Sequence, residues 1–286
     1  LTPSGWTQMG WLRVGDTLID PDGGTCSVTG VFPQGVKEVY RVTFSDGAET
    51  MCCDDHLWLV QTPSQRHRGH EGSVLSLRDI MHAGLFDSSG NSRFFIPLPV
   101  TDHDPRELPL DPYFLGAMLG DGCLTAGMPY FSNSDQDILA RVTQTAPVGT
   151  CLVAAGSYDY RLRGDSKPRS RSARGGFRKN TNRVTACLRG LGLMGLASHD
   201  KHIPHEYLVS SRDQRLELLR GLLDTDGTCG NSRSGGSHIE FSTSSLRLSR
   251  DYAALVRSLG GTCRTVSRST HYSHKGQRRT GRTSYR

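Results

Sequence analysis

The sequence has no Cys-x-x-Cys pair and no cysteine–histidine group with zinc-finger spacing, although it contains eight cysteines. Either pattern would have indicated a structural zinc site or a dithiol redox centre. The sequence also has no apolar run near the roughly 20 residues that a membrane helix needs, and no secretory signal peptide. We therefore expect reduced thiols in a cytoplasmic protein that has no membrane segment.

The composition is that of a globular protein, with 35% hydrophobic and 22% charged residues. A length of 286 residues is sufficient for two domains. The formal net charge is +6, which weakly favours a polyanionic partner. Because many basic proteins have the same totals, the positions of the charges carry more information than their sum.

Residues 1–62 predict a small all-β unit, since short alternating segments are separated by turns rich in Gly, Asp and Pro. Residues 63–106 are less regular and predict a connector with one small helix near residues 75–82. The chain begins at Leu1 without a methionine and stops inside a predicted strand at Arg286, so we expect it to be a piece of a larger protein.

Two helices with clear boundaries follow. Asp111-Pro112 predicts an N-cap and a first helical residue, and this helix should end at Asp121. A second helix should begin at Ser211, which has capping-box spacing to a glutamine, and end at Asp226. Each helix is thus expected to end in an Asp-Gly pair.

The surroundings of these two Asp-Gly pairs are repeated. Phe131-Ser132 follows the first pair and Phe241-Ser242 follows the second, and each precedes a further predicted helix. This internal repeat predicts two similar halves related by a pseudo-two-fold axis within a monomer.

Small residues lie one helical turn apart in each copy: Gly116 with Gly120, and Gly221 with Thr225. Such a face allows two helix backbones to approach closely. Their C-terminal ends, which carry the two aspartates, would then meet. Two carboxylates at negative helix ends repel each other unless a cation lies between them, and oxygen ligands of this kind suit Mg²⁺. For either copy alone, an ordinary helix-ending turn is the alternative.

Residues 219–227 resemble the LAGLIDADG motif of homing endonucleases, and residues 114–122 form a looser copy. The segment Lys201-His202-Ile203-Pro204 is similar to a block of intein endonucleases. The resemblance implies an α+β fold with two αββαββ halves over residues 107–286, the second cut short. It also implies cleavage of double-stranded DNA by metal-assisted hydrolysis, with Asp121 and Asp226 as catalytic Mg²⁺ ligands and Lys201 as a catalytic residue. The alternative for Lys201 is a solvated surface lysine.

Residues 1–16 resemble the opening of a Hint-type protein-splicing domain, and residues 52–58 resemble the block whose histidine promotes the N-terminal acyl shift. This resemblance implies a splicing role for His56, with a buried structural histidine as the alternative. Cys53 stands where that block often has threonine. Leu1 is no nucleophile and no His-Asn pair lies near Arg286, so we expect a truncated splicing domain that does not splice. A second-half counterpart of Lys201 is also expected beyond the sequence.

Basic side chains gather at matching places of the repeat, in residues 161–189 and 264–286. A solvated face or a flexible tail is the simpler interpretation of one such run, but two runs at equivalent places favour the arms of a DNA cradle. The second run predicts a hairpin whose tip, residues 275–281, is a basic loop that includes Arg278 and Arg279. The candidate DNA-binding residues are Arg161, Arg163, Arg264, Arg268, Lys275, Arg278, Arg279 and Arg282.

The sequence therefore predicts a site-specific double-strand DNA endonuclease that follows part of an all-β Hint domain. Two alternatives remain open. One is the same fold holding DNA without cutting it, and the other is a protein-splicing element whose nuclease has decayed to DNA binding only.

Overall fold

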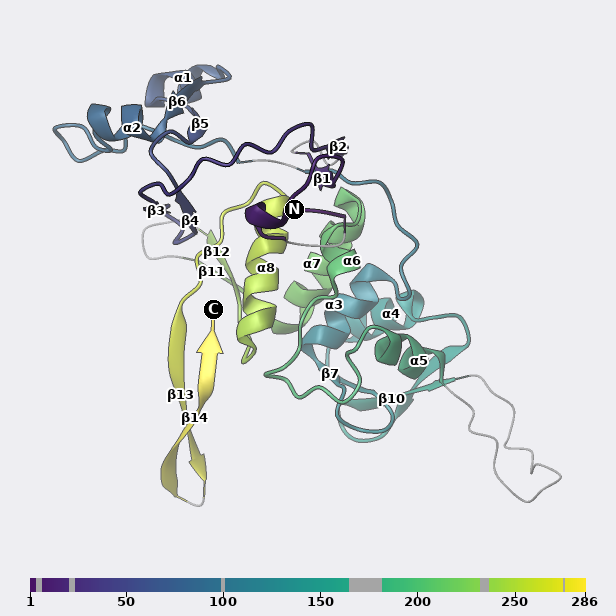
Figure 1. Cartoon of the computed structure of the whole chain (residues 1–286). Coiled ribbons are helices and arrows are strands. Elements are labelled where there is room, and N and C mark those ends of the chain that lie inside the picture. The colour runs from purple at the N-terminus through teal and green to yellow at the C-terminus, as the bar shows by residue number, and fades with distance from the viewer. Residues whose placement is uncertain (4–6, 21–23, 99–100, 165–181, 232–236, 275) are drawn as a thin grey trace.

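The chain forms a β-rich N-terminal part and a larger part in which paired helices are flanked by strands (Figure 1). The computed structural model describes residues 1–3, 7–20, 24–98, 101–164, 182–231, 237–274 and 276–286.

The N-terminal part consists of antiparallel two-stranded sheets. The pairs are β1 (Thr17–Ile19) with β2 (Thr25–Ser27), β3 (Tyr40–Thr43) with β4 (Glu49–Cys52), and β5 (Leu57–Val60) with β6 (Ser73–Ser76). A short 3-10 helix, η1 (Met9–Trp11), precedes them. Because β6 pairs with β5, β structure continues past residue 62 into the segment that we predicted to be a connector. The division of the chain at residue 62 stays a prediction.

Two small helices lie in that segment. Helix α2 (Leu77–Ala83) occupies the region where a helix was predicted. Helix α1 (Pro63–Arg68) was not predicted, because its sequence is polar and lacks helical periodicity. It forms through a capping box between Thr62 and Gln65 and ends at Gly69, whose φ of 69° is a left-handed conformation that suits glycine.

The larger part contains the same six elements twice. The first set is α3 (Pro112–Gly120), β7 (Gly122–Cys123), β8 (Tyr130–Ser132), α4 (Gln136–Thr145), β9 (Thr150–Ala154) and β10 (Asp159–Gly164). The second set is α7 (Arg212–Asp226), β11 (Gly227–Asn231), β12 (Ser237–Phe241), α8 (Leu246–Ser258), β13 (Ser267–His274) and β14 (Gln277–Tyr285). Helices α5 (Arg183–Gly190) and α6 (His205–Leu208) lie between the sets. The two sets share the same order of helices and strands, and the expected truncation of the second half stays a prediction.

The strands of the two halves also pair alike. In the first half the order is β7-β8-β10-β9. In the second, β11 pairs with β12 and β13 with β14, and a bridge between Thr243 and Tyr285 joins the two pairs. Gly122 is paired with Phe131, and Gly227 is paired with Phe241 in the same way. The glycine after each aspartate therefore has the same partner in both halves.

The helices begin as their sequences predicted. The Asp111 side chain accepts hydrogen bonds from the backbone of Tyr113 and Phe114, with proline at the first position of α3. The Ser211–Gln214 capping box begins α7, and the Ser245 hydroxyl caps α8. These local side-chain bonds fix where the helices that bear the two aspartates start.

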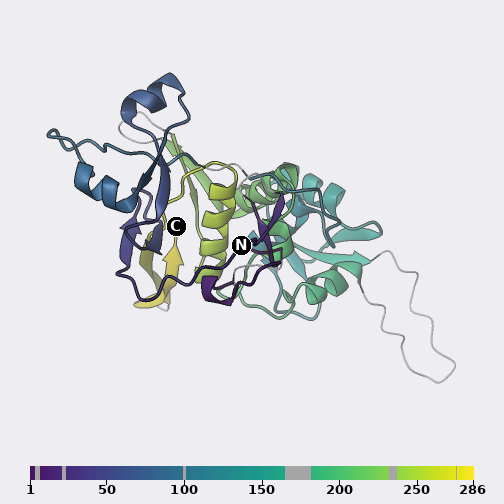
Figure 2. The ribbon, with the colours of Figure 1, turned by 45° about the horizontal axis from the view of Figure 1, so that its top comes forward.

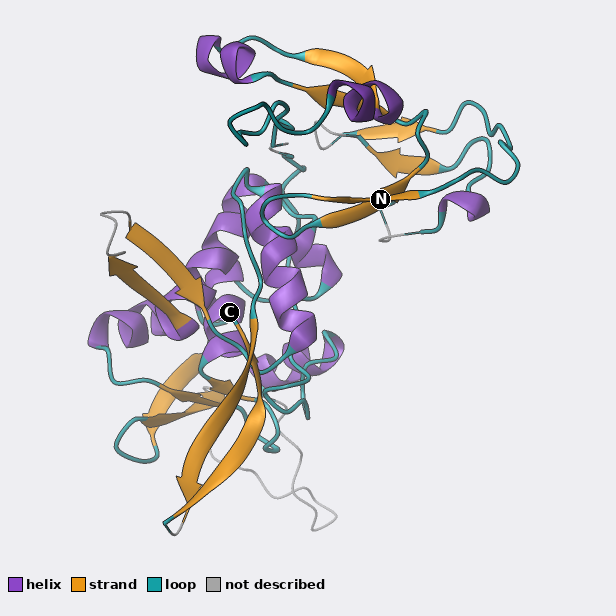
Figure 3. Ribbon diagram, turned by 90° about the vertical axis from the view of Figure 1, so that its left-hand side faces the viewer, coloured by secondary structure: helices purple, strands orange, loops and turns teal. Residues whose placement is uncertain are grey.

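Helices α3 and α7 lie side by side at the centre of the larger part (Figures 1 and 3). A Cβ on Gly116 would stand 2.3 Å from the carbonyl oxygen of Leu218, and a Cβ on Gly221 would stand 2.2 Å from that of Tyr113. One turn further on, a Cβ on Gly120 would stand 2.0 Å from the Thr225 hydroxyl. The predicted face of small residues is therefore the contact surface between the two helices.

The N-terminal part lies beside α8 rather than beside α5 (Figure 2). One ion pair connects the turn after β3 to α8, since Arg257 Nε lies 2.9 Å from an oxygen of Asp46. The Arg257 guanidinium also donates to the backbone carbonyl of Cys263. Through these bonds Arg257 ties the N-terminal part to the segment that leads into β13.

All eight cysteines are free thiols, as expected. None of the helices formed by the described residues has the length and apolarity needed to cross a membrane.

Replacement of Gly116 by alanine should destabilise the protein by about 2 kcal/mol or more, because the added methyl group would meet backbone rather than a movable side chain. Thermal unfolding followed by circular dichroism would measure the destabilisation. The control is Gly190→Ala in α5, where a Cβ meets nothing within 4 Å. Equal melting temperatures for both variants would contradict the close approach of α3 and α7.

Candidate nuclease site

Asp121 and Asp226 stand at the C-terminal ends of the two central helices. Asp121 is the C-cap of α3, and Asp226 is the last residue of α7. The carbonyl oxygen of Asp121 accepts from the Ser132 amide at 3.2 Å, and that of Asp226 accepts from the Ser242 amide at 3.1 Å. The backbone thus holds both aspartates in equivalent positions.

The two carboxylates are half-buried and influence each other. An oxygen of Asp226 would lie 3.5 Å from a Cβ on Gly120, directly beside Asp121. Burial, followed by the charge of Asp121, raises the pKa of Asp226 to about 6. Burial also raises the pKa of Asp121 above its ordinary value, although a hydrogen bond from Asn133 and the charge of Lys201 act in the opposite direction. The structure therefore brings together the carboxylates that the repeat predicted.

The first half has a side-chain hydrogen-bond donor to its aspartate that has no counterpart among the described residues of the second half. Asn133 Nδ2 donates to Asp121 Oδ2 at 2.7 Å. The matching residue is Thr243, whose hydroxyl accepts from the backbone of Ser245. Asn133 was not among the predicted site residues, although it follows the repeated Phe-Ser pair at the position where the two copies differ.

Lys201 is buried, with only 3% of the residue exposed, so the alternative of a solvated surface lysine is wrong. Its ammonium donates to the carbonyl oxygens of Leu119 and Gly120, both at 2.9 Å, and of Gly122 at 2.7 Å. Burial lowers the pKa of Lys201 to about 8, whereas the charges of Asp226 and Asp121 act to raise it. The ammonium is therefore committed to the backbone around Asp121, at the negative end of the α3 dipole.

Two carboxylates are a small ligand set for a metal. No group of three or more His, Cys, Asp or Glu side chains in the described ranges could hold an ion. Mg²⁺ is commonly bound through one or two carboxylates, with water and substrate phosphate completing its shell. The donor chemistry of Asp121 and Asp226 fits that ion.

A cleft of about 360 Å³ opens beside Asp226. Its wall includes Lys201 and Asp226 from the helical side and Thr270, Arg282 and Ser284 from the hairpin of β13 and β14. The second half of the repeat therefore contributes both an acidic group and a basic strand to one cleft.

The candidate DNA-binding residues of the first half lie on β10. Arg163 is exposed, and Arg161 is partly covered because its Nε donates to the Tyr130 hydroxyl at 3.0 Å. Leu162 between them is buried in the core. Strand alternation thus places both arginines on the face of the sheet away from the core. Most of the basic run that follows, residues 165–181, lies outside the described residues.

The predicted C-terminal hairpin is confirmed, but its strands are longer than the sequence indicated. Arg278 and Arg279 were expected in a loop and instead lie in β14, paired with Ser273 and Tyr272 of β13. Lys275 lies outside the described residues. The remaining candidates, Arg264, Arg268 and Arg282, are exposed.

His56 precedes β5 and is exposed, so it is not a buried structural histidine. Its ring packs edge-on against Trp58, with centroids 5.3 Å apart. Nothing in this geometry tests the splicing role implied by the resemblance.

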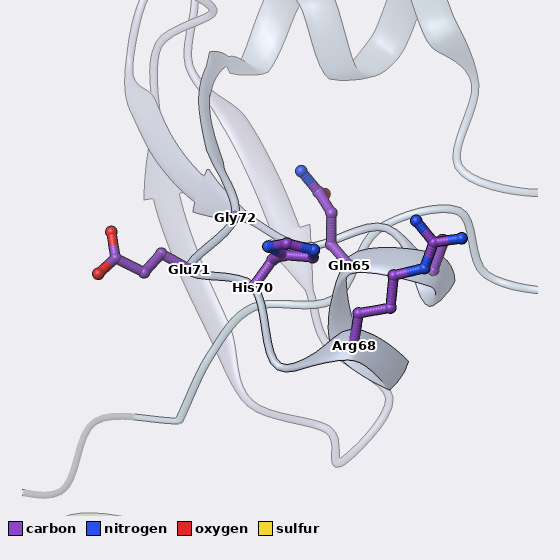
Figure 4. A pocket seen from close by; sticks show the side chains of 6 residues that line it. Gln65, Arg68, His70, Glu71 and Gly72 are labelled. Atoms are coloured by element: carbon purple, nitrogen blue, oxygen red, sulfur yellow. The ribbon is translucent and has the colours of Figure 1, made fainter.

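A second hollow, of about 550 Å³, lies beside α1 and is lined by Gln65, Arg68, His70 and Glu71 (Figure 4). It belongs to the N-terminal part and contains neither aspartate. Its mixed polar side chains form no predicted site.

In a comparison with known protein families, the second half of the repeat matches one family. Residues 213–285, from α7 to β14, match the family described as LAGLIDADG-like domain. The second half therefore carries a LAGLIDADG-like domain, which supports the resemblance to homing endonucleases.

Two relatives are replicative DNA helicases named DnaB. The chain is 30% identical over 287 residues to that of Mycobacterium intracellulare, and 27% identical over 243 residues to that of Rhodothermus marinus. The matches cover 93% and 82% of this chain but only 42% and 23% of those proteins. The chain thus spans less than half the length of either relative.

Replacement of Lys201 by methionine should lower the free energy of unfolding by about 2–4 kcal/mol, because several backbone carbonyls would be left without a buried hydrogen-bond donor. Melting without DNA or metal would isolate this structural effect from any catalytic one. Lys37→Met is the control, since the partly exposed Lys37 forms a surface ion pair with Asp55 and its replacement should change the melting temperature little. A melting temperature equal to that of the parent would show that Lys201 does not support the site.

Proposed function

We propose that residues 107–286 form a site-specific endonuclease that cuts both strands of double-stranded DNA by Mg²⁺-assisted hydrolysis. The observation that carries this proposal is the pair of half-buried aspartates at the touching ends of α3 and α7. Each is followed by a glycine with the same strand partner, so the chain presents two matched carboxylates, as cutting two strands requires.

In this proposal Asp121 and Asp226 bind Mg²⁺ and hold it between the helix ends. The ion would supply Lewis-acid polarisation of the phosphate and activation of water. Asn133 orients the Asp121 carboxylate through its hydrogen bond. Lys201 fixes the backbone on both sides of Asp121, so that this carboxylate does not shift when DNA binds.

The DNA would lie across the strands of the two halves. Arg161 and Arg163 lie on β10 of the first half, and the arginines of β13 and β14 lie on the hairpin of the second half. Arginines at such positions can contact phosphates and also recognise guanine through two hydrogen bonds. We propose that one monomer contacts both half-sites through its internal pseudo-two-fold symmetry.

The rival functions predict different behaviour. A DNA-binding module would bind the same duplex but leave it intact with Mg²⁺. Retention of both carboxylates, in a site where burial and mutual repulsion raise the pKa of Asp226, favours the endonuclease. A nicking assay with Mg²⁺ separates the two.

We also propose that residues 1–62 are part of a Hint-type splicing domain and that the parent protein is an intein. Support comes from the resemblance of residues 1–16 and 52–58 and from the matches to replicative helicases that are much longer than this chain. The flanking coding sequence tests this proposal. A Cys, Ser or Ala at the upstream junction and His-Asn at the downstream junction are expected, and their absence rejects it. A parent that splices while its nuclease part only binds DNA is the remaining alternative.

Asp121→Asn and Asp226→Asn should each abolish double-strand cutting and leave DNA binding near normal, because the amide removes a metal-binding charge with little change in volume. A cleavage assay and a binding titration on one duplex would measure both properties. Asp213→Asn, in the exposed first turn of α7, is the matched control. Cutting at close to the parent rate by either site variant would reject the paired-aspartate site.

Replacement of both Arg278 and Arg279 by alanine should weaken DNA binding and flatten its salt dependence, by about 1 in the log–log slope for each phosphate that is no longer neutralised. If one of them recognises a base, selectivity at that base pair should also fall. Titrations at several salt concentrations provide the measurement, with Arg220→Ala on α7 as a control outside the strands. An unchanged slope would exclude this part of the hairpin from the DNA contact.

A further inference from the structure

The cleft beside Asp226 receives one arginine from the hairpin. In the described part of its lining the basic side chains are Lys201 and Arg282, and the acidic side chain is Asp226. The Lys201 ammonium is already surrounded by the carbonyl oxygens of Leu119, Gly120 and Gly122. Lys201 therefore has little capacity left to bind a further anion in the cleft.

Arg282, in contrast to Lys201, is free to bind an anion. It is exposed, and its guanidinium makes no hydrogen bond or ion pair within the part of the chain that the structure describes. A planar guanidinium with its donors unused, beside a cleft, is suited to bidentate contact with an oxyanion.

A local irregularity of the hairpin determines where Arg282 stands. The strands pair regularly up to Ser269 with Thr283 and resume at His271 with Thr280. Gly281 and Arg282 of β14 therefore face a single residue of β13, which is the arrangement of a β-bulge. A bulge changes the direction of the side chains that follow it, and here the arginine at the bulge lines the cleft.

The bulge is held by its own contacts. The Thr270 hydroxyl donates to the carbonyl oxygen of Arg282 at 2.7 Å. A Cβ on Gly281 would stand 2.3 Å from that same hydroxyl oxygen, so glycine permits the close approach. The arginine is thus presented by a defined piece of backbone and not by a loose strand end.

From this geometry we infer that Arg282 binds a DNA phosphate within the cleft beside Asp226, and that this contact accelerates the cutting step in addition to contributing to affinity. The inference rests on the proposed function, because that function supplies the polyanion. It separates Arg282 from Arg278 and Arg279, which lie further along the hairpin and do not line the cleft. Contact with the phosphate would stabilise charge that develops there during hydrolysis.

The test uses the whole chain and a duplex that it selects from a random DNA library. Single phosphates across the centre of that duplex are replaced, one at a time, by neutral methylphosphonates. Without divalent ions, one replacement should weaken parent binding by roughly tenfold, since it removes the negative charge that the guanidinium binds. Arg282→Ala and Arg282→Gln should be insensitive to that same replacement. Arg279→Ala, from the same strand but outside the cleft, should keep the parent's sensitivity.

A second arm measures cutting with Mg²⁺ when all DNA is bound. Arg282→Ala should cut about 10²-fold more slowly than the parent. Arg279→Ala should instead show weaker binding at an unchanged rate. Arg282→Lys should restore the rate only in part, because lysine lacks the planar fork. Melting temperatures of all variants should match that of the parent, since these side chains are exposed.

The outcomes distinguish the two proposals. Equal sensitivity of Arg282→Ala and parent at every central phosphate overturns the inference, whatever happens to cutting. An unchanged rate for saturated Arg282→Ala also overturns it, while the proposed endonuclease stands. A parent that shows the phosphate coupling but never cuts leaves Arg282 as a phosphate contact and rejects the endonuclease. If the parent selects no duplex, both proposals fall.

Discussion

The close approach of α3 and α7 is the constraint on which the rest of the site depends. Gly116 and Gly221 let the two backbones touch where any side chain would meet a carbonyl oxygen. Since the helices then end side by side, the last residue of one and the cap of the other bring Asp121 and Asp226 together. The position of each carboxylate is therefore set by helix packing, and each half needs the other to complete the site.

The two halves agree in backbone but differ in side chains. Each aspartate carbonyl accepts from the amide of the serine that follows the repeated phenylalanine, and Asp121 also has a side-chain donor, Asn133. Lys201 likewise donates a hydrogen bond to the carbonyl oxygen of Gly120, at the end of α3. Asp226 lacks such a donor among the described residues, and burial beside another carboxylate raises its pKa. Burial thus disfavours two negative charges at the junction, which supports the proposal that a cation binds there.

Sequence patterns within a few residues of each other predicted much of the fold. Contacts between residues far apart in the chain could not be predicted and became known only from the structure. Helix starts at Asp111 and Ser211 were predictable because a cap involves neighbours within three residues. The repeat then located the aspartates without any structure. The burial of Lys201 was not predictable, because its partners lie about 80 positions earlier in the chain. The pairing of β6 with β5 was missed for a related reason, since α1 separates the two strands and its capping box was overlooked.

The two cations of the cleft show why residue type alone does not assign a role. Lys201 and Arg282 line the same space, but carbonyl oxygens of α3 and β7 surround the first, while the second has no such partners in the described structure. A buried ammonium satisfied by backbone stabilises that backbone, and its lowered pKa reflects the removal of water around it. An exposed guanidinium at a bulge has its N–H donors available to bind a ligand. The sequence resemblance singled out the lysine for catalysis. The contacts of Lys201 support our proposal that it holds Asp121 in place, and the exposure of Arg282 supports our proposal that the arginine binds the phosphate.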